Sequence, residues 1–493
     1  MKSLYIIKCC IGLCLLVLTG CQADIKLTGQ IDTLPTIYPD YQGVTIPPNI
    51  APLNFEVVTE EEGEWGLLIQ TTEQTYSIYA EERLFVFEED FWKSLLADNR
   101  GKALTFQICL KVNDGWKAYQ SFTMDVAEED IDPYMVYRLI PPGYSLWKEM
   151  GIYQRSLESF EEKAVYKNRE GKGNCVNCHS FAGGSPDKML FHMRSILPGT
   201  YLFKDGKKEK LETKTPHTLS ALVYPYWHPS GNYVAFSVNK TAQVLHTRNM
   251  NRIEVYDEAS DVVVYDVEKR EIVTASVLSS DKQYETFPAF SPDGNYLYYC
   301  TAEAVDSMPR QYREVKYSLC RVPFDAASRT FGAQVDTLYH APTMGRSVSF
   351  PRVSPDGRQL VFTLSDYGNF SIWHKDADLY RVSLGTGEIT ALDALNSEDV
   401  ESYHSWSSNS RWFVFSSKRE DGLHSRAYIA SIDEEGKVTK PFLLPQRNPV
   451  KYYRDLFDSH NCPDFTSTKV DFDVRTAREN LFSNERVQVK IRE

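Results

Sequence analysis

The sequence lacks the short motifs that mark several large enzyme classes. It contains no Gly-x-Ser-x-Gly nucleophile elbow, no phosphate-binding glycine loop and no His-Glu-x-x-His zinc motif. These absences argue against the common hydrolases and the nucleotide-dependent enzymes. We therefore expect a protein that is not an enzyme by itself.

Positive charge is also scarce. Lys and Arg number 54 against 67 Asp and Glu, which gives a net charge of −13, and loss of Lys2 and Lys8 with a leader peptide makes it −13 − 2 = −15. A chain this acidic is poorly suited to nucleic-acid phosphates or anionic lipid headgroups. We expect no nucleic-acid partner.

One short apolar run stands at the start of the chain. Residues 11–18 are apolar but too few for a permanent membrane helix, and two lysines precede them, as in a signal peptide. The Leu-Thr-Gly-Cys tetrad that ends at Cys21 resembles the bacterial lipobox, whose Cys receives a lipid anchor. The resemblance implies a signal peptide at 1–20 and lipidation of Cys21. It places the protein in the bacterial cell envelope, anchored to the outer membrane, facing the periplasm or the cell surface.

Aromatic residues, by contrast, are plentiful, with 30 Tyr and 25 Phe among 493 residues. This composition is typical of a folded, strand-rich chain that is long enough for two or three domains. Short alternating runs predict a small antiparallel sandwich, with helical residues at 91–97 inside it. The expected segments are a lipid-anchored linker at 21–50, a β-sandwich-like domain at 51–130, a bridging segment at 131–174 with a helix-like stretch at 157–164, and a β-domain at 175–480.

An internal repeat dominates the second half of the chain. Each unit has an aromatic or apolar residue, then Ser-Pro-Asp-Gly or a variant, then an apolar strand. The turn suits two antiparallel strands, because Pro presets one position and Gly accepts positive φ. Two further strands follow each turn, which makes four per repeat, as in a propeller blade. The units begin at Trp227, Phe290, Val353 and, in degenerate form, Trp406.

These repeats resemble those of the TolB family, which implies an all-β fold with a TolB-like β-propeller of six blades (five to seven) after the sandwich. A further unit is predicted at 185–192, and a last one from residues 134–155 paired with 456–474, which would join the ends of the chain. Together with the lipobox and a Cys-x-x-Cys-His motif, the repeats resemble a group of Bacteroidetes lipoproteins described as TolB-like or cytochrome-c-type.

The cysteines give the most specific chemical prediction. Apart from the leader and Cys21, only Cys175 and Cys178 are close in sequence, and His179 follows them directly. Two thiols at this spacing can join both vinyl groups of a haem, and the next His can bind its iron. The sequence therefore predicts one covalent c-type haem on Cys175 and Cys178 with His179 as an iron ligand. His192 is the favoured second ligand, with Met189 and Met193 as alternatives.

Other occupants of this motif stay open. A structural zinc ion is an alternative cofactor, held by Cys175, Cys178, His179 and either His192 or Cys462. A disulfide or a free dithiol at Cys175 and Cys178 is a third possibility. The haem reading predicts electron transfer or redox sensing, through a propeller that docks a protein partner in an envelope redox or assembly complex. The alternative is a haem-free protein-interaction scaffold.

Overall fold

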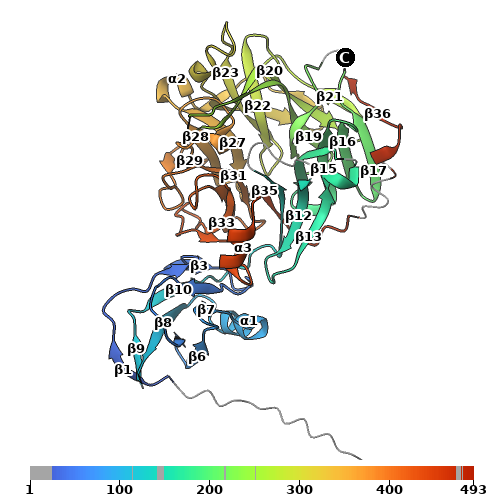
Figure 1. Ribbon diagram of the computed structural model, residues 1–493. Helices are drawn as coiled ribbons and strands as arrows, with labels where there is room; N and C mark the ends of the chain where they lie inside the picture. The colour runs from blue at the N-terminus through green and yellow to red at the C-terminus, as the bar shows by residue number, and fades with distance from the viewer. Residues whose placement is uncertain are drawn as a thin grey trace, which may run out of the picture.

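The structure, a computed structural model, describes residues 25–113, 115–141, 149–171, 173–215, 218–249, 251–472, 479 and 481–492. Almost all regular structure in this part of the chain is β (Figure 1). The exceptions include three short α-helices, α1 (Glu89–Asp98), α2 (Ala341–Met344) and α3 (Pro449–Asp455). Among the described residues, no helix combines the length and apolarity needed to cross a membrane.

The N-terminal domain, blue in Figure 1, contains two sheets and α1. Helix α1 covers the expected 91–97 and buries Trp92, Leu95 and Leu96. The larger sheet has the order β1-β9-β8-β10-β3, with β5 beside β8 and β6 beside β5, and the smaller one is β2-β4-β7. The strands are β1 (Leu27–Gln30), β2 (Ile37–Tyr38), β3 (Val44–Ile46), β4 (Phe55–Val57), β5 (Trp65–Gln70), β6 (Thr75–Tyr79), β7 (Leu84–Phe85), β8 (Ala103–Val112), β9 (Gly115–Ala118) and β10 (Phe122–Val126).

The expected linker at 21–50 is wrong for its described part. Strands β1, β2 and β3 belong to the two sheets, and Val44 and Ile46 are fully buried. Strand β3 pairs in parallel with β10, so that Val44 lies opposite Met124. A three-residue strand whose partner is so distant leaves no local periodicity in the sequence.

The rest of the described chain forms six sheets of four or five strands, in which neighbours in sequence pair antiparallel. One strand of each sheet lines a central cavity, and it is given first for each sheet in the list that follows. The sheets are β35 (Ser459–Thr466), β11 (Tyr134–Ile140), β12 (Gly151–Ser156) and β13 (Glu162–Lys167); β14 (Cys175–Ala182), β15 (Ser185–Arg194), β16 (Gly199–Lys204) and β17 (Lys207–Glu212); β18 (Val223–Trp227), β19 (Tyr233–Leu245), β20 (Ile253–Asp266) and β21 (Glu271–Val273); β22 (Gln283–Phe290), β23 (Tyr296–Glu303), β24 (Ser318–Asp325), β25 (Thr330–Phe331) and β26 (Asp336–Tyr339); β27 (Ser347–Val353), β28 (Gln359–Ser365), β29 (Asp378–Ser383) and β30 (Ile389–Ala391); β31 (Glu401–Trp406), β32 (Trp412–Ser417), β33 (Arg426–Ser431) and β34 (Phe442–Leu443).

This arrangement is β-propeller-like, and it confirms the strands expected from the repeat. The glycines of three repeat turns, Gly231, Gly294 and Gly357, have φ of 69°, 75° and 74°, the positive values that the turn requires. In the unit that begins near residue 185 the turn differs from the prediction. Ala182 pairs with Ser185, so the chain reverses at Gly183 and Gly184, and the Ser-Pro-Asp tripeptide lies in β15.

The two ends of this β-domain meet in one sheet. Strand β11 pairs antiparallel with β35, and Leu139 lies opposite His460. The joining of 134–155 with 456–474 is thus confirmed. The expected bridging segment at 131–174 is wrong, because it contains β11, β12 and β13 of the first sheet. The helix-like stretch at 157–164 is also wrong, because it holds bends and the start of β13. Val165 and Tyr166 are buried within β13.

Two short C-terminal strands each extend one of the six sheets. Strand β36 (Val487–Gln488) pairs in parallel with the outer strand β17, and β37 (Lys490–Ile491) pairs in parallel with β21. The N-terminal domain packs against the β-domain through hydrogen bonds such as Tyr41 Oη to the Leu443 carbonyl at 3.2 Å. One large apolar cluster contains residues of both domains.

Candidate functional site

Strand β14 carries the Cys-x-x-Cys-His motif along the wall of the central cavity. This cavity has a volume of about 1220 Å³, and Cys175, Cys178, His179 and His192 all line it. Val176 and Phe181 anchor the strand in an apolar cluster between β14 and the sheet of β11. The motif is therefore held on a buried strand rather than on a surface loop.

At Cys178 the backbone leaves the extended conformation, with φ of 53°. The pairing of β14 with β15 shifts register between Asn177 and Ser180, which marks a β-bulge. The same device occurs once in each cavity-lining strand, at residues with φ between 48° and 53°. We call these residues the waist ring: Cys178, Tyr224, Phe287, Phe350, Tyr403 and Cys462.

Four members of the waist ring are aromatic and pack on one another. Ring centroids are 4.7 Å apart for Tyr224 and Phe287, 4.0 Å for Phe287 and Phe350, and 4.7 Å for Phe350 and Tyr403. Cys178 and Cys462 complete the ring where the sheets of β14 and β35 adjoin. One side of the cavity is thus aromatic at this level, and the other carries thiols.

Sequence reasoning missed the waist ring, although a signal for it exists. Each aromatic member stands three residues before the residue that opens a repeat unit, as Tyr224 does before Trp227. Phe181 and Phe465 hold the same offset from Cys178 and Cys462. Because the six residues share this offset within the chain, they occupy equivalent positions on the six cavity-lining strands.

His179 is buried, with 8% of its surface exposed. Burial, with a smaller contribution from the Arg138 guanidinium, lowers the pKa of His179 to about 4, so the imidazole is neutral near pH 7. Its Nε2 has no hydrogen-bond partner within the described chain. A neutral imidazole nitrogen with no partner is the form in which His binds a metal.

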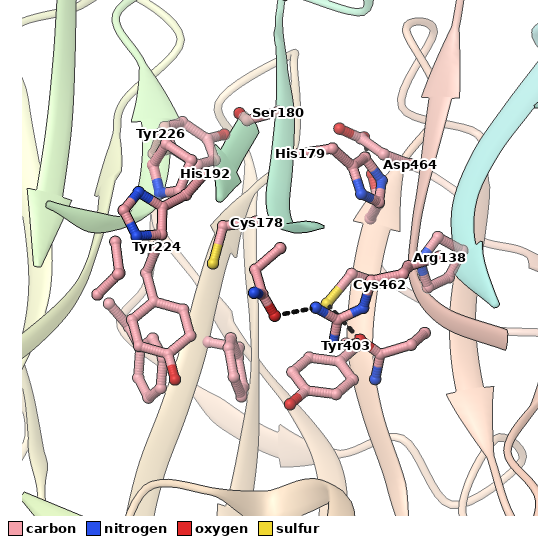
Figure 2. Close-up of a pocket in the computed structure, with 18 of the residues that line it drawn as sticks. Arg138, Cys178, His179, Ser180, His192, Tyr224, Tyr226, Tyr403, Cys462 and Asp464 are labelled. Atoms are coloured by element: carbon pink, nitrogen blue, oxygen red, sulfur yellow. Dashed lines mark hydrogen bonds between the residues drawn. The ribbon is translucent and has the colours of Figure 1, made fainter. Parts of the chain in front are cut away.

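His179 and His192 do not converge on one point. In Figure 2 the His179 ring points toward Asp464, whereas His192 lies beside Tyr224 and Tyr226. His192 sits on β15 opposite Asn177, and its Nδ1 is 3.2 Å from the Thr200 hydroxyl. Burial lowers the pKa of His192 to about 3. Both imidazoles line the cavity, but they point in different directions.

The two methionine alternatives are buried in the apolar cluster that anchors β14, on the face opposite to His192. Met189 and Met193 are 1% and 0% exposed. The Met193 sulfur accepts a hydrogen bond from Asn174 Nδ2 at 3.4 Å. Its sulfur therefore already has a protein partner.

The side chains around the motif can be compared with the needs of a haem and of a zinc ion. Three features suit a haem: the cavity volume of about 1220 Å³, the two thiols that line the cavity, and the unpaired Nε2 of His179. Haem attachment needs Cys178 and His179 to serve one group, yet Cys178 points toward Tyr224 and His179 away from it (Figure 2). Cys178 has a positive φ of 53° and stands where the strand bends, so its thiol and the next side chain diverge.

For zinc, the described residues include no group of three or more His, Cys, Asp or Glu side chains placed to hold a metal ion. The described cysteines are all free thiols, including Cys175 and Cys178. Cys300 and Cys320 are buried in different apolar clusters, on β23 and β24. The lipobox and Cys21 lie outside the described residues.

Two histidines outside the motif have hydrogen bonds to a neighbouring sheet. His228 Nδ1 lies 2.8 Å from the Ser230 hydroxyl, and its Nε2 lies 3.2 Å from the Gly294 carbonyl. His404 Nε2 lies 3.0 Å from the Val361 carbonyl. His460 is buried, and neither of its ring nitrogens has a partner within the described chain.

Comparison with known proteins adds little to this geometry. No family model and no curated protein matches the chain. Among solved structures, an oligogalacturonate lyase in complex with manganese is 12% identical, with a TM-score of 0.36 over 62% of this chain and 73% of the other. The periplasmic gluconolactonase of Pseudomonas aeruginosa is 13% identical, with a TM-score of 0.34 over 64% and 97%. Prolyl oligopeptidase B of Galerina marginata is 11% identical, with a TM-score of 0.35 over 62% and 44%. At such scores the likenesses carry no functional argument.

Proposed function

We propose that this chain is an envelope lipoprotein that binds one covalent c-type haem and acts in electron transfer or redox sensing. The observation that carries the proposal is His179, a buried neutral imidazole with an unpaired Nε2, next to two cysteines in a cavity of about 1220 Å³. A haem supplies one-electron chemistry whose potential depends on its ligands and surroundings.

Each residue of the motif has a proposed role. Cys175 and Cys178 would hold the haem through thioether bonds, and His179 would bind the iron through Nε2. The apolar cluster around Val176 and Phe181 fixes the strand beside His179. No role toward the haem is assigned to His192, which lies beside Tyr224 and Tyr226 (Figure 2).

The finer architecture belongs to the same proposal. We infer a six-bladed TolB-like propeller whose first and last strands share the sheet of β11 and β35, preceded by a β-sandwich formed by the two N-terminal sheets. A protein partner in the envelope would dock on this propeller. The lipid anchor at Cys21 would hold the whole chain at the outer membrane.

Attachment is tested on the mature protein produced with cytochrome c maturation machinery. We expect a Soret band and a haem-stained band that survives denaturation, both lost in Cys175→Ala and in Cys178→Ala. Cys462→Ala is the matched control, because it alters a waist-ring thiol outside the motif, and it keeps the haem. A wild-type protein without covalent haem would contradict the proposal.

A second candidate is a haem-free interaction scaffold with a zinc ion or a disulfide at Cys175 and Cys178. The observation in its favour is that Cys178 and His179 point to different sides of the cavity wall (Figure 2). Stoichiometric zinc whose chelation destabilises the fold, or a mass shift on reduction, would identify it. Two titratable free thiols without metal would contradict this candidate.

A further inference from the structure

The lining of the central cavity is cationic although the chain is acidic. Its charged side chains are four cations and two acids, namely Arg138, Arg194, Arg352, Lys418, Asp132 and Asp464. In the described part of the chain, none of the four cations lies within 4.0 Å of a carboxylate oxygen. Both acids already accept hydrogen bonds, Asp464 from the Ser405 hydroxyl at 2.6 Å and Asp132 from Ser408 at 2.7 Å.

Within the described chain, Arg138 is the one of these cations whose side chain bonds to the motif strand β14. Its side chain reaches from β11 toward Cys462 (Figure 2). Nη1 donates to the Val176 carbonyl at 3.3 Å and to Asn177 Oδ1, and Nη2 donates to Asn461 Oδ1 at 3.0 Å. Its Nε is buried and has no acceptor. All three acceptors are neutral, so the guanidinium charge has no counterion in hydrogen-bond contact.

The groups that face Arg138 do not supply the missing negative charge. The groups that accept its hydrogen bonds are a backbone carbonyl and the amide oxygens of Asn177 and Asn461, all of them uncharged. Arg138 is partly buried, and a charge that is partly removed from water without a counterion is costly.

The walls near Arg138 are suited to an organic ligand rather than to a bare inorganic ion. Tyr224, Phe287, Phe350 and Tyr403 form the aromatic side of the waist ring. Farther along the cavity, Lys418 is 3% exposed and its Nζ lies 3.3 Å from the ring centroid of Trp373. Ligand sites combine such apolar walls with a few polar groups that fix orientation.

We propose that the central cavity binds an organic carboxylate, whose acid group is held by Arg138 and whose carbon skeleton packs on the aromatic members of the waist ring. Arginine pairs with carboxylates through charge-assisted hydrogen bonds. The propionates of a haem and a free organic acid share this chemistry. The site at Arg138 does not depend on haem attachment.

The test is the melting temperature of the full mature chain with benzoate and with glucuronate, each against its neutral counterpart, benzyl alcohol and glucose, at constant ionic strength. A ligand that binds only the folded state raises the melting temperature. We expect at least one acid to stabilise the protein and its neutral counterpart not to. Arg138→Gln lowers the affinity about tenfold or more, and Arg138→Lys lowers it less. The matched control is Arg321→Gln, which removes a guanidinium paired with Asp336 on another sheet and keeps wild-type affinity.

Two preparations separate the sources of the carboxylate. If acids bind protein made without haem but not the haem-loaded protein, the propionates occupy the Arg138 site. If acids bind both preparations, the ligand is a free organic acid. Acids that act no better than their neutral counterparts in both preparations overturn the proposal. So does a folded Arg138→Gln variant with wild-type affinity. Covalent haem in the absence of any acid binding would leave the proposed function standing and remove this inference alone.

Discussion

Cys178 and Cys462 occupy equivalent positions on strands that lie at opposite ends of the β-domain sequence. Their φ values are 53° and 50°, and each stands at a β-bulge in the strand that lines the cavity. The pair closes the waist ring where β14 and β35 adjoin. A residue of the Cys-x-x-Cys-His motif and a residue outside it thus share one backbone geometry.

The bulge geometry predicts which substitutions Cys462 tolerates. Cys462→Val places a β-branched side chain at positive φ and lowers the free energy of unfolding by about 1–2 kcal/mol relative to Cys462→Gly. Denaturant unfolding measures the difference. Cys320→Val is the control, because Cys320 on β24 does not have a positive φ, and it shows no such penalty relative to Cys320→Gly. Equal stability of the valine and glycine variants at 462 would contradict the bulge.

Because β35 closes the waist ring as a core strand, we expect truncation of its buried Phe465 to lower the free energy of unfolding strongly. This side chain is 2% exposed and belongs to the apolar cluster that spans both domains. Phe465→Ala leaves a cavity and lowers the free energy of unfolding by about 3–5 kcal/mol. Phe457→Ala is the matched control, because Phe457 is 75% exposed, and it changes stability little. Similar effects of the two variants would argue against β35 as a core strand.

The buried His179 predicts a pH dependence. Its pKa is about 4 in the fold against 6.5 for an ordinary histidine, so between these pH values the unfolded chain binds a proton that the folded chain does not. The free energy of unfolding therefore falls as the pH drops through this window. His179→Gln removes this contribution, and the loss of stability from pH 7 to pH 4.5 becomes smaller. An unchanged pH profile in the variant would contradict the burial of a neutral imidazole.

Glu285 predicts a pH dependence of stability that is opposite to that of His179. It is fully buried, neither carboxyl oxygen has a hydrogen-bond partner within the described chain, and burial with the nearby Asp261 raises its pKa to about 8. Between about pH 4.5 and 8 the folded chain holds a proton that the unfolded chain releases, so this contribution to stability is lost as pH rises. Glu285→Gln gains stability relative to wild type as the pH increases. Glu303→Gln, at an exposed site, is the control, and a pH-independent effect at 285 would contradict the prediction.

The repeat units made much of the β-domain predictable. Pro-Asp-Gly turns and alternating strands are local signals, and the strands after Phe290 and Val353 lie where the pattern placed them. Strands β1 and β3 of the N-terminal domain were not predicted, because their parallel partners lie far away in sequence. The stretch at 157–164 was misassigned because its apolar spacing is also compatible with a helix, whereas pairing of β13 with β12 decides the structure.

The candidate site was predictable only in part. The motif singled out Cys175, Cys178 and His179, and all three line the central cavity. The different directions of His179 and His192 depend on how β14 and β15 pair, and the β-bulge at Cys178 shifts that pairing. Arg138 was not predicted as a site residue, because it reaches the motif from another sheet and only the folded chain brings it to Asn177.

The most direct test of the account is the intact mass of the mature protein after expression with cytochrome c maturation machinery, together with its absorption spectrum. The account predicts the mass of the chain plus one haem, a Soret band, and loss of both signals in Cys175→Ala and Cys178→Ala but not in Cys462→Ala. A wild-type mass without haem, from cells that load haem onto a control cytochrome c, would contradict it.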